Sequence, residues 1–249
     1  EEIPPPSNCR VACLPGYTEI NCVCVKNTTP PPPKPDPCAE TIRQAFYSLI
    51  QQGKLAEILS KFNGSNAQYK INISIGSLGS DGDLARTSNS GTYRTYNIVF
   101  NENYPNATSL SKATSLIHEY IHAYFNTLRD DWKNNGNIHA FDDYPALKSF
   151  YIDDTYPSFN PKDAHHEAIA TSFIDIMAAA IQEFQTGTPV ITIDPFYRDM
   201  AWGSLQGTPA YDNSNLTQTD KDRIGSVRTT ERDNKPIGTN TPIGTPCNN

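Results

Sequence analysis

The sequence lacks both a long apolar run and a cluster of basic residues. No apolar stretch approaches the ~18 residues that a membrane-spanning helix needs, so we expect no transmembrane segment. Lys and Arg together number 20 against 27 Asp and Glu, which gives a net charge of -7. Because nucleic-acid binders usually carry a basic stripe that neutralises phosphates, we expect no nucleic-acid partner.

Cysteine is sparse in most of the chain but crowded at one end. Four of the six cysteines are Cys9, Cys13, Cys22 and Cys24. This crowding is typical of disulfides in an oxidising compartment. A zinc knot is the alternative, but one residue between Cys22 and Cys24 is fewer than the usual two to four. The pattern predicts a secreted or cell-surface protein, with its N-terminus as a candidate tether.

A proline-rich segment divides the chain. Residues 28–37 read Thr-Thr-Pro-Pro-Pro-Pro-Lys-Pro-Asp-Pro, a composition that favours a semi-rigid polyproline II spacer. Residues 1–27 are too few to form a core without disulfides, so we expect a small Cys-rich module there. It is a candidate for binding a surface partner, and a pro-segment or stalk is the alternative. If its four cysteines pair among themselves, Cys38 and Cys247 remain to close a large domain at 38–249.

The large domain is predicted to be α+β, because apolar residues follow helical spacing in some segments and alternate in others. The region 76–91 is rich in Gly, Ser and Asp and predicts a loop. The expected elements are two short helices within 38–62 interrupted at Gly53, strands at 69–75 and 93–100, and helices at 109–128, 161–185 and about 216–227. Asn160 followed by Pro161 predicts the N-terminus of the second long helix.

The helix expected at 109–128 carries His118, Glu119 and His122. Two histidines four residues apart project from one face of a helix, about one turn apart, and can bind a single ion. From its position beside the first histidine, Glu119 can accept a proton from a water that the metal activates. The alternative is that both histidines pack in the helix for structural reasons.

This segment resembles the zincin metallopeptidases, in which a strand, a His-Glu-x-x-His helix and a second helix with the third ligand form the site. The order of predicted elements is the same. The resemblance implies that an edge strand, here 93–100, binds an extended peptide. The chain lacks the Gly and third His that follow the motif in metzincins, and it lacks the Glu-x-x-x-Asp of thermolysin-like enzymes. What remains resembles the SprT-like bacterial metallopeptidases and related secreted zincins, in which a later His completes the site.

His165 and His166 are the candidates for that third ligand. The helical row through His166 contains Ile169, Phe173, Met177 and Phe184, an apolar stripe that we expect to face the core and the first helix. His166 is therefore predicted to point inward, and His165 to sit at the rim or to hydrogen-bond a ligand. Glu167 stays an alternative, because the helix phase is uncertain near its N-terminus.

These patterns together predict a secreted zinc metallopeptidase acting on a peptide or protein. Zn²⁺ would be held by His118, His122 and His166, with Glu119 as general base. A secreted binding or adhesion protein with a structural or inactive zinc site is the main rival, and a toxin specific for one protein partner is a third possibility. A structural site has no use for Glu119 beside an open position.

Overall fold

The chain folds into two compact units, Glu1–Pro33 and Lys34–Asn249. A computed structural model describes residues 17–20, 23–26, 33–65, 67–79, 82–155 and 161–247. In the first unit, strands β1 (Tyr17–Ile20) and β2 (Val23–Lys26) pair antiparallel. Cys24 of β2 is disulfide-bonded, while the other three cysteines of the predicted module lie outside the described residues.

The second unit contains a three-stranded mixed sheet in the order β3-β5-β4. Strands β3 (Lys70–Gly76) and β5 (Thr95–Asn101) are parallel and confirm the two predicted strands. Strand β4 (Ala85–Asn89) pairs antiparallel with β5 in the region predicted as a loop. That prediction was wrong because Ala-Arg-Thr-Ser-Asn has no apolar alternation, and pairing with β5 makes it a strand.

Helices make up most of the rest of this unit, so the coarse α+β prediction is confirmed. The described residues contain α1 (Pro37–Leu49), α2 (Gly53–Ser60), α3 (Ser109–Asn135), the 3₁₀ helix η1 (Ile138–Phe141), α4 (Pro145–Tyr151), α5 (Pro161–Ser172), α6 (Ile174–Thr186), α7 (Pro195–Gly203), α8 (Pro209–Asp212) and α9 (Gln218–Asp233). None of them is long and apolar enough to cross a bilayer.

The second long helix is broken, contrary to the prediction of one helix at 161–185. It starts at Pro161 as expected, although Asn160 lies outside the described residues. At Phe173 the backbone leaves the helical region, with φ -124° and ψ -8°. The Thr171 hydroxyl donates to the carbonyl of Glu167 at 2.9 Å, a local bond that competes with the helix ladder and bends helices.

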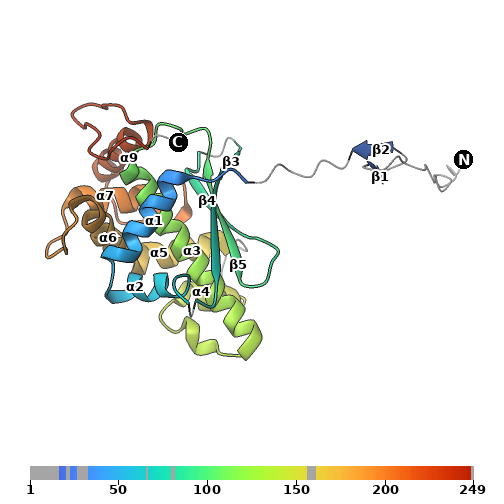
Figure 1. Ribbon diagram of the computed structural model, residues 1–249. Coiled ribbons are helices and arrows are strands. Elements are labelled where there is room, and N and C mark those ends of the chain that lie inside the picture. The colour runs from blue at the N-terminus through green and yellow to red at the C-terminus, as the bar shows by residue number, and fades with distance from the viewer. Residues whose placement is uncertain are drawn as a thin grey trace, which may run out of the picture. The chain divides into compact units, whose positions relative to one another are not determined.

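Helix α3 occupies the centre of the second unit. The sheet covers one side of it, and α1, α2 and α6 pack against it from the other (Figure 1). It begins at the N-cap Thr108, whose hydroxyl accepts the N–H of Ser111 at 3.1 Å. It runs past the predicted end at Leu128 to Gly136, which takes the left-handed conformation at φ 69°. The helical spacing of apolar residues thus ends at Leu128, before the helix itself ends.

Several distant segments meet at the N-terminus of α3. The carboxylate of Glu231 is fully buried and accepts the hydroxyl of Thr108 and the main-chain N–H groups of Ile243 and Gly244. A Cβ on Gly244 would lie 2.6 Å from the Thr108 hydroxyl, so only glycine fits there. These contacts fasten α9 and the C-terminal segment to the helix that carries the His-Glu motif.

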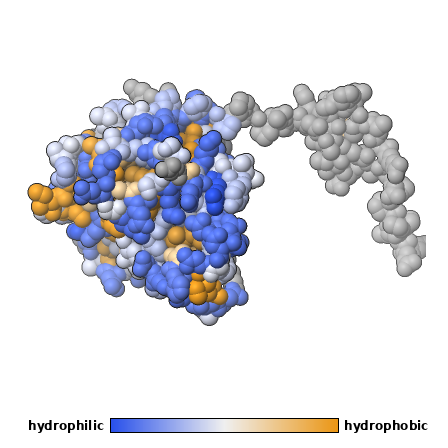
Figure 2. Space-filling model, turned by 60° about the horizontal axis from the view of Figure 1, so that its bottom comes forward, coloured by the Kyte–Doolittle hydropathy of each residue, from blue (hydrophilic) through white to orange (hydrophobic). Residues whose placement is uncertain are grey.

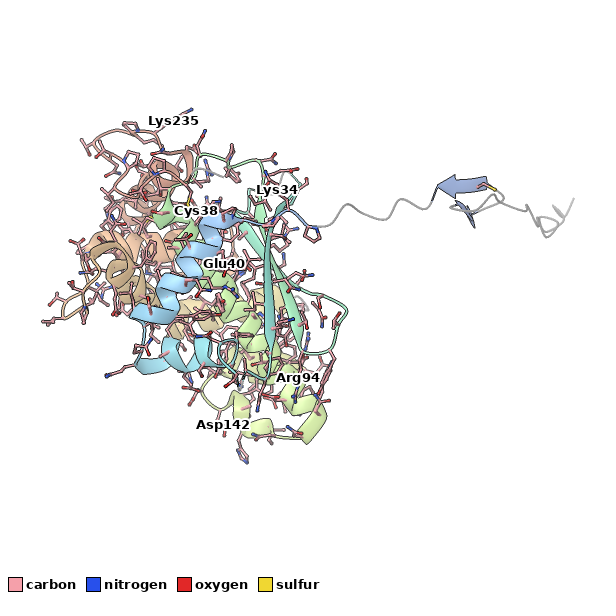
Figure 3. The ribbon with its side chains drawn as sticks, viewed as in Figure 1. Lys34, Cys38, Glu40, Arg94, Asp142 and Lys235 are labelled. Atoms are coloured by element: carbon pink, nitrogen blue, oxygen red, sulfur yellow. A yellow bond between two sulfur atoms is a disulfide. The ribbon has the colours of Figure 1, made fainter. Side chains whose placement is uncertain are left out.

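A disulfide joins the two ends of this unit. Cys38, in the first turn of α1, bonds Cys247, 209 residues further along the chain (Figure 3). The pairing is the one expected if the first four cysteines pair among themselves. In the same figure, Lys34 and Arg94 mark opposite ends of the sheet. Lys34 belongs to the folded unit, because its carbonyl accepts the N–H of Ile75 on β3 at 2.8 Å.

The face of the large unit drawn in Figure 2 is mainly hydrophilic, with its apolar side chains in separate groups. The interior is mainly apolar, and several of its buried polar groups are paired. One is the ion pair between Lys112 Nζ and Asp36 Oδ2 at 2.8 Å, whose side chains are 2% and 0% exposed. The other oxygen of Asp36 caps α1 by accepting the N–H of Ala39. This pair therefore fixes α1 on α3.

We predict that Lys112→Met lowers the free energy of unfolding by about 3–5 kcal/mol, because it leaves the Asp36 carboxylate buried without its cation. Urea denaturation measures the change. Lys148→Met is the matched control, since Lys148 pairs with Asp142 on the surface and its loss should not move the midpoint. Equal midpoints for both variants would contradict the anchoring role of the buried pair.

Candidate metal centre and cleft

The His-Glu segment lies in the middle of α3, where the helix is buried. His118, Glu119 and His122 are each less than 9% exposed. The helical repeat places the two histidines on one face, and their Nε2 atoms are 2.9 Å apart. The Thr87 hydroxyl on β4 donates to the Glu119 carbonyl at 2.9 Å, which ties the sheet to this turn of the helix.

His166 on α5 completes a cluster of three imidazoles. Its Nε2 lies 3.2 Å from Nε2 of His122, and the candidate ligand atoms of all three rings lie within 4.8 Å of one another. Zinc bonds of about 2.0–2.1 Å in tetrahedral geometry separate nitrogen ligands by about 3.3 Å. The three histidines could therefore hold one metal ion, and their donor set suits zinc.

The distal nitrogens of two of these rings have partners. Nδ1 of His118 lies 3.0 Å from the hydroxyl of Ser204, which follows α7. Nδ1 of His122 lies 3.0 Å from Nδ1 of His165, and Nε2 of His165 lies 2.9 Å from the hydroxyl of Tyr151. Such contacts fix the orientation and tautomer of a ligand ring. Nδ1 of His166 is buried without a hydrogen-bond partner among the described residues.

His165 and His166 differ from the prediction in their burial. His166 belongs to the cluster as predicted, but it is partly exposed at the cleft, whereas His165 is 4% exposed. His165 is thus not at the rim, but it meets the other branch of the prediction, because its Nδ1 lies 3.0 Å from Nδ1 of the candidate ligand His122. The stripe itself is buried as predicted at Ile169, Phe173 and Met177, and His166 at its N-terminal end lies where the stripe meets the cleft. Glu167 is not part of the cluster.

Burial keeps the clustered rings neutral. It lowers the pKa values of His118 and His122 well below their ordinary value, and the like charges of neighbouring histidines add to the effect. Burial also lowers the pKa of His165 to about 3 and that of His166 to about 4. Neutral imidazoles are the form that binds metal ions.

Glu119 is shifted in the opposite sense. Burial raises its pKa to about 7, while hydrogen bonds from the Thr87 hydroxyl and main-chain N–H oppose the shift. These bonds place the carboxylate beside β4. Glu119 lines the same cleft as the three histidines. Its position fits a group that exchanges a proton with a molecule bound in the cleft.

The cleft has a volume of about 510 Å³ and runs between β4, α3, α5 and the segment after α7. Strand β4 forms one wall of the cleft. One edge of β4 pairs with β5, and at the two ends of this pairing the carbonyl of Leu84 accepts the N–H of Asn101 and the N–H of Ser90 donates to the carbonyl of Thr95. By the alternation of an antiparallel pair, the main-chain groups of residues 85, 87 and 89 face away from β5.

The predicted substrate strand was therefore wrong. The strand expected at 93–100 is β5, which is the central strand and is paired on both sides. A paired strand has no free main-chain groups to offer a peptide. The edge strand next to α3 is β4, in the segment that sequence patterns assign to a loop.

Sequence patterns missed further residues of the site. Ser204 and Thr87 have no motif that distinguishes them from other hydroxyl residues, and Tyr151 is one of 13 tyrosines. Their roles follow from the packing of α7, β4 and α4 around α3. His139 is exposed and pairs with Asp142.

Comparison with protein-family models, with curated proteins and with solved structures finds no match to this chain.

We predict that His166→Ala abolishes tight zinc binding, because the site loses one of three nitrogen ligands. His165→Ala should retain zinc with an affinity about 10- to 100-fold weaker, since it removes only the partner of His122. Metal content and competition with a chromophoric chelator measure both effects.

Glu167→Ala is the matched control on the same helix and should bind zinc as the wild type does. Full zinc content in His166→Ala combined with depletion in Glu167→Ala would overturn the ligand set.

Proposed function

We propose that the large unit is a secreted zinc-dependent metallopeptidase that hydrolyses peptide bonds in a peptide or protein substrate. One observation carries the proposal: three imidazole Nε2 atoms converge beside the buried carboxylate of Glu119 in one cleft. Three protein ligands leave a fourth position for water or substrate, as catalytic zinc sites do.

Zinc fits these residues by ligand type and by the separation of their nitrogens. When bound, it would supply Lewis acidity that activates water and polarises the scissile carbonyl. Ser204 and His165 orient the rings of His118 and His122 for that purpose.

Glu119 is the proposed general base. It accepts a proton from the attacking water as the new C–O bond forms, and it then passes that proton to the nitrogen of the leaving amine as the peptide C–N bond breaks. Its contacts with Thr87 hold it between the metal ligands and the edge strand.

Strand β4 is the proposed binding shelf for the substrate. An extended peptide that adds to a free strand edge is held by main-chain hydrogen bonds, which tolerate many side chains. The outward main-chain groups of Ala85 and Asn89 are available on the cleft side. A peptide lying there would pass Glu119.

The order strand, His-Glu helix and third-ligand helix supports the resemblance to zincins, and the disulfides support a secreted location. Both remain proposals. Cys38–Cys247 closes a loop of 209 residues in sequence, a bond that persists in oxidising compartments.

We predict that Glu119→Gln keeps zinc and lowers kcat about 10²- to 10⁴-fold, because the amide fills the same space but cannot accept the proton. Digestion of a peptide library by the zinc-loaded full chain, with and without chelator, measures this loss. Glu167→Gln makes the same chemical change outside the cleft and should retain wild-type turnover.

Wild-type turnover in Glu119→Gln would rule out its role as base. A zinc-loaded wild-type chain that cleaves no peptide would instead favour the binding or adhesion protein.

A further inference from the structure

One arginine that lines the cleft has no carboxylate partner at ion-pair distance within the part of the chain that the structure describes. Four arginines line the cleft. Three of them pair with a carboxylate: Arg86 with Asp83 at 2.7 Å, Arg129 with Asp130 at 2.9 Å, and Arg232 with Asp233 at 2.7 Å. Arg228, on α9, has no carboxylate within ion-pair distance among the described residues.

Arg228 is held in a defined position. Its guanidinium donates to the side-chain oxygen of Gln206 at 3.1 Å and to the carbonyl of Gly82 at 3.4 Å, both neutral acceptors. Its aliphatic stem lies over Gly203, where an added Cβ would approach the Cβ of Arg228 to 3.0 Å. Gly203 directly precedes Ser204, the partner of His118. The cation therefore rests on the turn that orients a metal ligand.

The surroundings compensate this charge only in part. Burial lowers the pKa of Arg228, and the like charge of Arg232 one turn away lowers it further, while Tyr104, Asp83 and Asp233 oppose the shift without cancelling it. The cleft as a whole is lined by five basic and three acidic side chains, although the chain carries a net charge of -7. A partly buried cation without a counter-ion gains most from an anion that enters with the ligand.

We infer that Arg228 binds a carboxylate of the substrate, so that the enzyme selects peptides that carry an acidic group next to Arg228. The planar guanidinium still has N–H donors that its two neutral acceptors do not use, and it matches the two oxygens of a carboxylate. The group is either the C-terminal carboxylate or an Asp or Glu side chain. This inference rests on the proposed peptidase function.

The test uses the zinc-loaded full chain and matched fluorogenic peptides. In one set, a single Glu or Gln is placed at each position of an otherwise neutral peptide with a C-terminal amide. In the other set, the neutral peptide ends in a free acid or an amide. We expect kcat/KM to be about tenfold higher for the acidic member of one set, and the set identifies the source of the carboxylate.

Arg228→Gln should erase that preference, so that the acidic and the neutral member of the set are cleaved with equal kcat/KM. Arg228→Lys keeps the positive charge but loses the planar pair of N–H donors, so it should retain part of the preference. Arg232→Gln is the matched control, because Arg232 lies one turn away and already has Asp233 as its partner. It should keep the wild-type preference. Thermal unfolding of each variant checks that the fold is intact.

A second measurement separates this inference from the peptidase proposal. Fluorescence anisotropy records binding of the same labelled peptides to the zinc-loaded Glu119→Gln protein with and without Arg228→Gln, and it needs no turnover. Acidic peptides that bind more tightly through Arg228 but are never cleaved by the wild type would sustain the inference and refute the peptidase. Equal binding and cleavage of acidic and neutral peptides, or a preference that survives Arg228→Gln, would overturn it.

Discussion

The structure depends on bringing three imidazole rings together, those of His118 and His122 in the buried middle of α3 and that of His166 on α5. A buried ring nitrogen without a partner costs free energy, and three Nε2 atoms that converge within 4.8 Å cannot all satisfy one another. One cation between them could accept all three lone pairs at once. The elements around α3 follow from this constraint: α7 ends where Ser204 meets His118, and α5 brings His165 and His166 against His122.

A turn that is to bind a metal ion needs a rigid frame, because ligand geometry tolerates little displacement. The buried Glu231 carboxylate, the Lys112–Asp36 pair and the Cys38–Cys247 disulfide all lie near the N-terminal half of α3. Each joins segments far apart in sequence. The face of α3 opposite this frame meets β4, so the cleft is open where the helix has only a short edge strand beside it.

Sequence patterns predicted the parts of this fold that rest on local periodicity. The two main strands, the helices around Gly53 and the start of the ligand helix at Pro161 are where the spacing places them. His118, Glu119 and His122 follow from one motif. The break at Phe173 and strand β4 could not be predicted in this way, because no Gly or Pro marks the first and pairing with β5 makes the second a strand. The roles of Ser204, Tyr151 and Arg228 could not be predicted either, because they depend on how distant helices pack around α3.

The proposed function requires one zinc ion at the point where the three rings converge. X-ray absorption at the zinc edge of the loaded full chain measures this coordination directly. We predict three imidazole nitrogens and one oxygen at about 2.0–2.2 Å, with no sulfur. A shell with sulfur at about 2.3 Å would place the zinc on cysteines. A shell with fewer than three imidazoles would likewise contradict the site formed by His118, His122 and His166.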